Sequence, residues 1–256
     1  MIASDQQSNA VSPGLRTEDQ AMLPSSCPAS SIAVSRRKSR VTVACVGKGG
    51  SGKSSVITNL AVAGLNAGLK VGIIDADPQQ SAYLWNRVRT RGDIPVCRSD
   101  PAALGPLIDS ARRAAIELTF IDMPPDLRHV PIAARYADLV LIPMRPTLFD
   151  LKVTHSLIRI LDSVSCSYAV VLNAAPPIRE FGESPMVRDA RAALRDVSPR
   201  LWQGQITNRV TVPHATVRGS GVVEFEPAGP AARELRSLWA AVSKTLKLEG
   251  ASREHV

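Results

Sequence analysis

The stretch with the clearest chemical potential is a glycine-rich run that contains two lysines. Residues 47–54 read GKGGSGKS and match the pattern G-x-x-x-x-G-K-[ST] of a phosphate-binding loop at every specified position. Glycine permits positive φ and close backbone approach, so successive N–H groups can face a polyphosphate. We expect a nucleotide to be held by the residues Gly47, Lys48, Gly49, Gly50, Ser51, Gly52, Lys53, Ser54 and Ser55.

The end of this run carries the groups that suit phosphate and metal binding. Lys53 is positioned to reach the β- and γ-phosphates, and the Ser54 hydroxyl is a ligand for Mg²⁺. The helix expected after the loop adds the positive end of its dipole. The predicted ligands are therefore ATP and Mg²⁺, and the alternative is a glycine-rich turn that binds nothing.

Three aspartates at strand ends are candidates for metal binding and hydrolysis. Asp75 and Asp77 follow the apolar run 71–74, and Asp122 ends the apolar run 118–121. A carboxylate near the γ-phosphate can align a water for in-line attack, and one that shares a water with Ser54 can hold Mg²⁺. The alternative for Asp75 and Asp77 is an acidic cap on the next helix, and for Asp122 it is a chance aspartate at a strand end.

The pattern of apolar runs predicts the elements that position these residues. Runs typical of buried parallel strands occupy residues 41–46, 71–75, 118–122, 137–143 and 168–173, with weaker strands near 95–97 and 203–207. Helical patterns occupy residues 53–67, 81–89, 101–115, 148–164, 185–196 and 230–246. This alternation predicts an α/β fold with a doubly wound, mostly parallel sheet in a single domain. The motifs fall at the carboxyl ends of strands, where such sheets bind ligands.

Lys48 carries a narrower resemblance, because the general loop pattern leaves its position open. With it the loop resembles K-G-G-x-G-K-[ST] of the deviant Walker A family, which includes ParA, MinD and the nitrogenase iron protein. The segment DADPQ at 75–79 is similar to the ParA segment D-x-D-P-Q. Residues 137–151, ADLVLIPMRPTLFDL, resemble the ParA pattern A-D-x-V-L-I-P-x-x-P-S-x-x-D-L. The resemblance covers about residues 40–246.

The resemblance implies roles for single residues. In this family the extra lysine reaches across a nucleotide-sandwich dimer to the partner's phosphates, and the second aspartate of the D-x-D segment orients the attacking water. The resemblance therefore implies that Lys48, Lys53 and Asp77 are catalytic. Asp75 would join Ser54 and Asp122 at the metal. Asn173, at the end of a predicted strand, would hydrogen-bond the adenine base. A solvated lysine at 48 and a loop cap at 173 are the alternatives, and the family pattern places Asp150 at the dimer face.

The resemblance also implies a function: slow, partner-stimulated ATP hydrolysis by a protein that forms a homodimer when ATP is bound. Such a dimer binds DNA without sequence preference and segregates plasmid or chromosomal DNA with a ParB-like centromere-binding protein. The alternatives are positioning of a non-DNA cargo and a MinD-like membrane-associated ATPase. We expect no stable membrane association, because residues 248–256 lack an amphipathic basic pattern.

Composition and charge agree with this expectation. The 31 Lys and Arg against 23 Asp and Glu give a net charge of +8, which favours an anionic partner, either nucleic acid or an acidic membrane face, without deciding between them. Arg188, Arg191 and Arg195 recur on one face of the predicted helix 185–196 and are candidates for DNA phosphate contacts, with a solvated face as the alternative. The four cysteines form no C-x-x-C pair, which argues against an iron–sulfur carrier and fits a cytoplasmic protein. The resemblance implies that the protein is nucleoid-associated.

The predicted domain organisation has three parts. Residues 1–38 are polar, rich in serine and without periodicity, and we expect a disordered N-terminal tail. Residues 39–248 form the P-loop ATPase domain, and residues 249–256 form a C-terminal tail.

Overall fold

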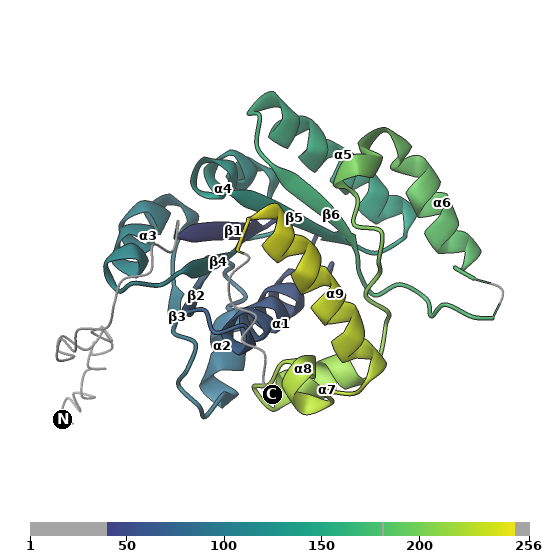
Figure 1. Cartoon of the computed structure of the whole chain (residues 1–256). Helices are drawn as coiled ribbons and strands as arrows, with labels where there is room; N and C mark the ends of the chain where they lie inside the picture. The colour runs from purple at the N-terminus through teal and green to yellow at the C-terminus, as the bar shows by residue number, and fades with distance from the viewer. Residues whose placement is uncertain (1–39, 181, 249–256) are drawn as a thin grey trace, which may run out of the picture. The chain divides into compact units, whose positions relative to one another are not determined.

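A computed structural model describes residues 40–180 and 182–248 of the chain, so the two predicted tails lie outside the described residues. Within these ranges a six-stranded sheet has the order β3-β2-β4-β1-β5-β6, and every paired strand is parallel (Figure 1). Its strands are β1 (Val41–Cys45), β2 (Val71–Asp75), β3 (Val96–Arg98), β4 (Leu118–Asp122), β5 (Leu139–Met144) and β6 (Tyr168–Leu172). The predicted doubly wound α/β fold is confirmed.

Helices cover both faces of the sheet and form two apolar cores (Figure 1). The first face carries α1 (Lys53–Asn66), α2 (Ser81–Val88), α7 (Thr211–Val217), α8 (Val222–Phe225) and α9 (Pro230–Thr245). The second face carries α3 (Leu104–Arg113), α4 (Val130–Tyr136), α5 (Leu148–Ser163) and α6 (Pro185–Ala193). Along β1, Val43 and Cys45 pack into the first core and Ala44 into the second, as the alternation of strand side chains requires.

The strand register brings the carboxyl ends of three central strands level with one another. Asp122 at the end of β4 pairs with Cys45 of β1 on one side and with Asp75 of β2 on the other. The loop that follows β1 therefore emerges beside both carboxylates. Residues separated by more than forty positions in the chain meet at this edge because the strands are parallel and in register.

Some predicted elements differ from the structure. The strand predicted near 203–207 is wrong: this part of the chain forms isolated bridges, of Leu201 with Val170 and of Thr207 with Ala175, and Ile206 N donates to the Leu172 carbonyl at 2.8 Å. The side-chain amides of Gln203 and Gln205 donate to the carbonyl groups of Leu201 and Pro176, which competes with a regular ladder.

Helix boundaries also shift. Asp100 caps the short 3₁₀ helix η1 (Pro101–Ala103) by accepting from Ala102 N at 2.8 Å, and α3 begins only afterwards. The predicted helix 185–196 ends as α6 at Ala193 and continues as the 3₁₀ helix η3 (Arg195–Arg200). Sequence patterns did not reveal α4, α7, α8 or the 3₁₀ helix η2 (Leu127–His129), all of which are seven residues or shorter. None of the described helices is long and apolar enough to cross a membrane.

Candidate nucleotide-binding site

The glycine-rich loop lies between the end of β1 and the start of α1, as predicted, and two of its glycines adopt positive φ. These are Gly50 at 74° and Gly52 at 94°. A Cβ at Gly52 would lie 2.1 Å from Asn173 Nδ2, so only glycine fits at this position. The turn is closed by Ser51 N, which donates to the Lys48 carbonyl at 3.1 Å.

The loop borders a cavity of about 380 Å³ that is lined by Lys53 and Asp77, two of the three predicted catalytic residues, but not by Lys48. Lys53 Nζ lies 3.5 Å from Asp77 Oδ2, and both side chains are buried. Asp77 is further held by Gln79 N, which donates to its Oδ1 at 2.9 Å. A buried lysine at the start of a helix, opposite a buried carboxylate, is an arrangement that can bind an anion and align a water beside it.

Ser54 and Asp122 form a second polar pair, and their atoms fit a magnesium ion. Ser54 Oγ donates to Asp122 Oδ2 at 2.5 Å, while the buried Oδ1 has no partner among the described residues. Burial raises the pKa of Asp122 to about 7, and the nearby Asp75 and Asp77 add to the rise. A cation would relieve this cost, since a hydroxyl and a carboxylate with a free oxygen are ligands that Mg²⁺ accepts.

Asp75 is used differently from its neighbours in this conformation. Its Oδ2 accepts from Tyr83 N at 2.9 Å and its Oδ1 from Asp77 N at 3.2 Å, so the carboxylate orders the start of α2. Burial raises the pKa of Asp75 even though these hydrogen bonds lower it. The geometry agrees with the alternative of a helix cap, and the role of Asp75 at the metal stays a prediction.

Lys48 pairs with a carboxylate from a distant part of the chain. Its Nζ lies 3.0 Å from Asp150 Oδ1, and the Asp150 side chain is only 4% exposed. Arg145 N donates to the other oxygen of Asp150 at 3.1 Å, and the Lys48 amine stands 5.9 Å from the centroid of the Phe149 ring. Lys48 is therefore not a freely solvated lysine here. Its reach across a dimer stays a prediction, and no pattern in the sequence indicated its pairing with Asp150.

Asn173 lies directly against the loop rather than in an open groove. Its Nδ2 donates to the Ser51 carbonyl at 2.6 Å, and the residue is buried. This bond fixes the end of β6 to the loop. A contact of Asn173 with the adenine base stays a prediction.

Two links from the site into α8 were missed by sequence reasoning. From α1, Asn59 Oδ1 accepts from Val222 N at 2.7 Å. From the end of α2, the buried Arg89 bonds both oxygens of Glu224 at 2.8 Å and the carbonyl of Gly219 at 2.9 Å. The run VEFEP at 223–227 contains Glu224, but the sequence pattern predicted no contact for it.

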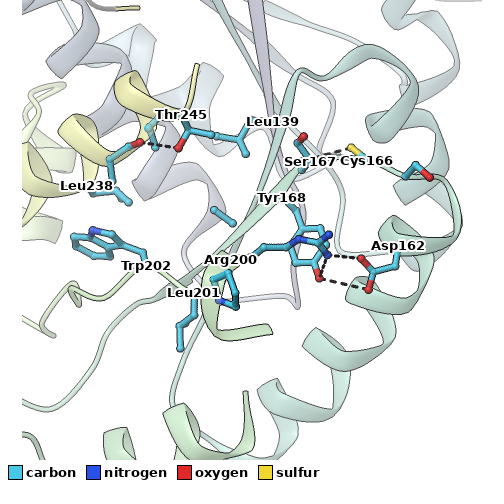
Figure 2. A pocket seen from close by; sticks show the side chains of 15 residues that line it. Leu139, Asp162, Cys166, Ser167, Tyr168, Arg200, Leu201, Trp202, Leu238 and Thr245 are labelled. Carbon is cyan, nitrogen blue, oxygen red and sulfur yellow. Dashed lines mark hydrogen bonds and ion pairs between the residues drawn. The ribbon is translucent and has the colours of Figure 1, made fainter. Parts of the chain in front are cut away.

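The predicted basic face of α6 is only partly free. Arg188 and Arg195 are exposed, but Arg191 pairs with Glu183 at 2.9 Å and donates to the carbonyl groups of residues 202–204. Figure 2 shows Arg200 directed at Asp162 and Tyr168, at 2.5 Å and 2.8 Å, beside a second cavity of about 540 Å³. This cavity is lined by the first residues of β5 and β6, so it lies at the sheet edge opposite the loop.

Comparisons with known proteins agree with this geometry. The model of the CobQ/CobB/MinD/ParA nucleotide binding domain matches residues 42–247. The "Maintenance of carboxysome distribution protein A" of Gloeobacter kilaueensis is 30% identical over 81% of this chain and 94% of its own. "Protein ParA" of Rhizobium radiobacter is 33% identical over 43% of this chain and 50% of its own. The solved septum site-determining protein MinD of Pyrococcus horikoshii, complexed with Mg-ADP, has a TM-score of 0.63 and 20% identity, with 82% of this chain and 98% of that one covered.

Proposed function

Because the chain belongs to the CobQ/CobB/MinD/ParA family of nucleotide-binding domains, we propose that it is an ATPase that dimerises when ATP is bound and positions a cargo over DNA. One observation carries the proposal. Two lysines of one loop are each held by a buried carboxylate, Lys53 by Asp77 and Lys48 by Asp150. A triphosphate can replace those carboxylates as the counter-charge. Nucleotide binding would then free Asp77 to orient a water and Lys48 to contact a partner's phosphates.

The hydrolytic step follows from the positions of these groups. The loop N–H groups and Lys53 bind the phosphates, and Asp77, freed from Lys53, orients a water for attack on the γ-phosphorus. The bond from the γ-phosphorus to the bridging oxygen breaks, which yields ADP and phosphate. Ser54 and Asp122 would hold Mg²⁺, which supplies charge neutralisation at the β- and γ-phosphates when it is bound.

The proposal is a switch rather than a rapid catalyst. Lys48 bound to Asp150 is turned to its own chain, whereas Lys48 bound to a partner's phosphates would tie two chains together. Loss of the γ-phosphate removes that contact and returns the lysine to Asp150. A partner protein on the cargo would accelerate hydrolysis and so release the dimer from non-specific DNA, and the protein would be cytoplasmic and nucleoid-associated.

The kind of cargo that we propose depends on how much of the chain each relative matches. The longer match, to a carboxysome distribution protein, favours a protein assembly as the cargo. Segregation of plasmid or chromosomal DNA with a ParB-like partner is the second candidate, which the shorter match to protein ParA favours. In both cases the ATP switch is the same, and the partner distinguishes them.

The test is nucleotide-dependent assembly of the full chain. We expect monomers with ADP and dimers with Mg²⁺ and the slowly hydrolysed analogue ATPγS in sedimentation velocity, and only the dimers should bind an arbitrary DNA duplex. Lys53→Ala should abolish binding of a fluorescent ATP analogue, whereas Lys48→Ala should keep binding and lose the dimer. A wild-type chain that binds no magnesium nucleotide would refute the proposal.

A further inference from the structure

The second cavity, of about 540 Å³, has no part in the proposed ATPase cycle. It is lined by the first residues of β5 and β6, by the end of η3 and by the last turns of α9, at the sheet edge opposite the glycine-rich loop. Its volume is in the range of cavities that hold small organic ligands. Such cavities combine apolar walls with a few polar groups that are held in place, and this cavity has both.

One wall of the second cavity is aromatic and aliphatic. Figure 2 shows Trp202 and Leu238 across the cavity from Arg200. The Trp202 ring packs tightly over Gly204, where an added Cβ would lie 2.3 Å from the ring atom Cζ2. The Trp202 backbone is fixed as well, because its N–H donates to the Val170 carbonyl at 2.9 Å. No described residue accepts from Trp202 Nε1, so a fixed flat ring with an unused donor borders the cavity.

The opposite wall presents a guanidinium that is held in place but only partly used. Arg200 is stacked on the Tyr168 ring at 4.5 Å from its centroid. Its Nη1 donates to Asp162 Oδ1 at 2.5 Å and to the Tyr168 hydroxyl at 2.8 Å. No described residue accepts from Arg200 Nε or Nη2, which together form the side edge of the guanidinium. Two parallel N–H donors on one edge match the two oxygens of a carboxylate or a phosphate.

We propose that the second cavity binds a small organic anion with a flat ring. The anionic group would accept from the free side edge of Arg200, and the ring would lie against Trp202 and Leu238. Because Tyr168 and Asp162 already hold the guanidinium, binding would cost little ordering of this side chain. This site goes beyond the proposed function and does not depend on it.

The charges that line the cavity favour an anion over a cation. Asp162 and Arg200 are the only acidic and basic side chains among the described residues that line it. Both oxygens of Asp162 already accept hydrogen bonds, Oδ1 from Arg200 and Oδ2 from the Tyr168 hydroxyl at 3.5 Å. The unused capacity therefore lies on the cationic partner, and a carboxylate and a phosphate share the chemistry that would satisfy it.

The experiment is isothermal titration calorimetry of the full chain with 1-naphthoate and 1-naphthyl phosphate, each with and without saturating Mg²⁺ and ADP. We expect at least one of these anions to bind with a dissociation constant of about 1 mM or below, whether or not ADP is present. The tighter of the two identifies the anionic group. Acetate and inorganic phosphate, which lack the ring, should bind at least about 10-fold more weakly.

Variants assign the binding to this cavity. Arg200→Gln should weaken the naphthyl anions roughly 10- to 100-fold, because charge-assisted hydrogen bonds are lost. The neutral analogue 1-naphthalenemethanol should bind wild type and Arg200→Gln equally, which shows that the cavity is intact. Arg200→Lys keeps the charge without the side edge and should also lose affinity. Ala241→Trp, which fills the cavity from α9, should abolish binding of all three naphthyl compounds.

The matched control is Arg195→Gln, because Arg195 is an exposed arginine of η3 that does not line the cavity, and this change should leave binding unaltered. Wild-type affinity in both Arg200 variants overturns the inference, as does a wild-type chain that binds neither naphthyl anion. Loss of binding in saturating ADP also overturns it, because the anion would then occupy the nucleotide site. A chain that binds a naphthyl anion in this cavity but no magnesium nucleotide refutes the proposed function alone.

Discussion

Replacement of Glu224 by glutamine tests whether the ion network between α2 and α8 stabilises the fold. Arg89 is almost fully buried and has five short contacts: two to Asp93, two to Glu224 and one to the Gly219 carbonyl. Glu224 also accepts from Gly221 N at 3.1 Å and from Arg91 at 2.9 Å. Glutamine keeps the shape but removes the charge and turns one acceptor into a donor that faces other donors.

The magnitude follows from the burial of the pair. Breaking a buried ion pair from one side costs roughly 3–5 kcal/mol, and Asp93 remains as a partner of Arg89, so we expect a loss of about 3 kcal/mol at neutral pH. Glu226, in the same run of sequence, is exposed, and its carboxylate accepts from Thr211 Oγ1 at 3.2 Å without an ion pair to any described residue, so Glu226→Gln should change stability by less than about 0.5 kcal/mol.

The stability difference between wild type and Glu224→Gln should also depend on pH. Burial pushes the pKa of Glu224 up, but hydrogen bonds from Arg89 and Gly221 outweigh it and hold the pKa below its usual range. A lowered carboxyl pKa contributes stability that is present above the unfolded value of about 4.3 and is lost as pH falls through the folded value. The gap between wild type and Glu224→Gln should therefore be constant from neutral pH to about pH 5 and shrink below about pH 4.

Urea unfolding followed by circular dichroism measures these differences. If the free energy of unfolding of Glu224→Gln lies within about 0.5 kcal/mol of wild type at neutral pH, the reasoning is refuted. The attraction between Glu224 and Arg89 would then do no more than offset the cost of removing the carboxylate from water. A gap that grows as pH falls would contradict the assigned sign.

Three further predictions concern the site and its surroundings. Asp77→Ala should slow ATP hydrolysis roughly 100-fold in single turnover while nucleotide binding is retained, because the residue orients water rather than phosphate. Because the pKa of Asp122 is raised to about 7, the metal-free wild type should lose stability as pH rises from about 4 to 7, and Asp122→Asn should abolish that loss. Thermal melting of both proteins at about pH 5 and pH 8 checks this prediction, and identical pH profiles of the two proteins would contradict it. The double change Arg188→Ala with Arg195→Ala should lower the slope of log affinity for DNA against log salt by roughly 2 without affecting stability, whereas Arg191→Ala should lower the melting temperature, because only Arg191 is bound to Glu183 and to backbone carbonyls. Equal effects on salt dependence from all three arginines would refute that division.

The parts of the site that could be predicted are those encoded by neighbouring residues. The loop 47–54 is a contiguous motif whose glycines and lysine have fixed spacing, and the apolar run before Asp122 identifies a buried strand end. Pairs that depend on packing left no such mark. Lys48 and Asp150 are 102 positions apart and Arg89 and Glu224 are 135 apart, so their contacts arise only after the sheet order is set.

Periodicity failed for a related reason at α6. The spacing of Arg188, Arg191 and Arg195 predicts one helical face, but α6 ends at Ala193 and Arg195 lies in η3. The spacing also does not say what each arginine contacts. Arg191 donates to Glu183 and to the backbone that follows η3, so its guanidinium holds that backbone in place and is not free to contact DNA. A basic residue on a helix therefore predicts a nucleic-acid contact only when no acidic side chain or open carbonyl group lies within its reach.

The segment from Gly219 to Glu226 shows what the C-terminal third of the chain does for the site. Asn59 on α1 receives the Val222 N–H, and Arg89 after α2 binds the Gly219 carbonyl and Glu224. The helix α1 begins with Lys53, and the helix α2 follows Asp77, so one short segment contacts both helices that carry the paired charges of the cavity. The segment 219–224 is thus a brace that bonds α1 through Asn59 and the residue that follows α2, Arg89.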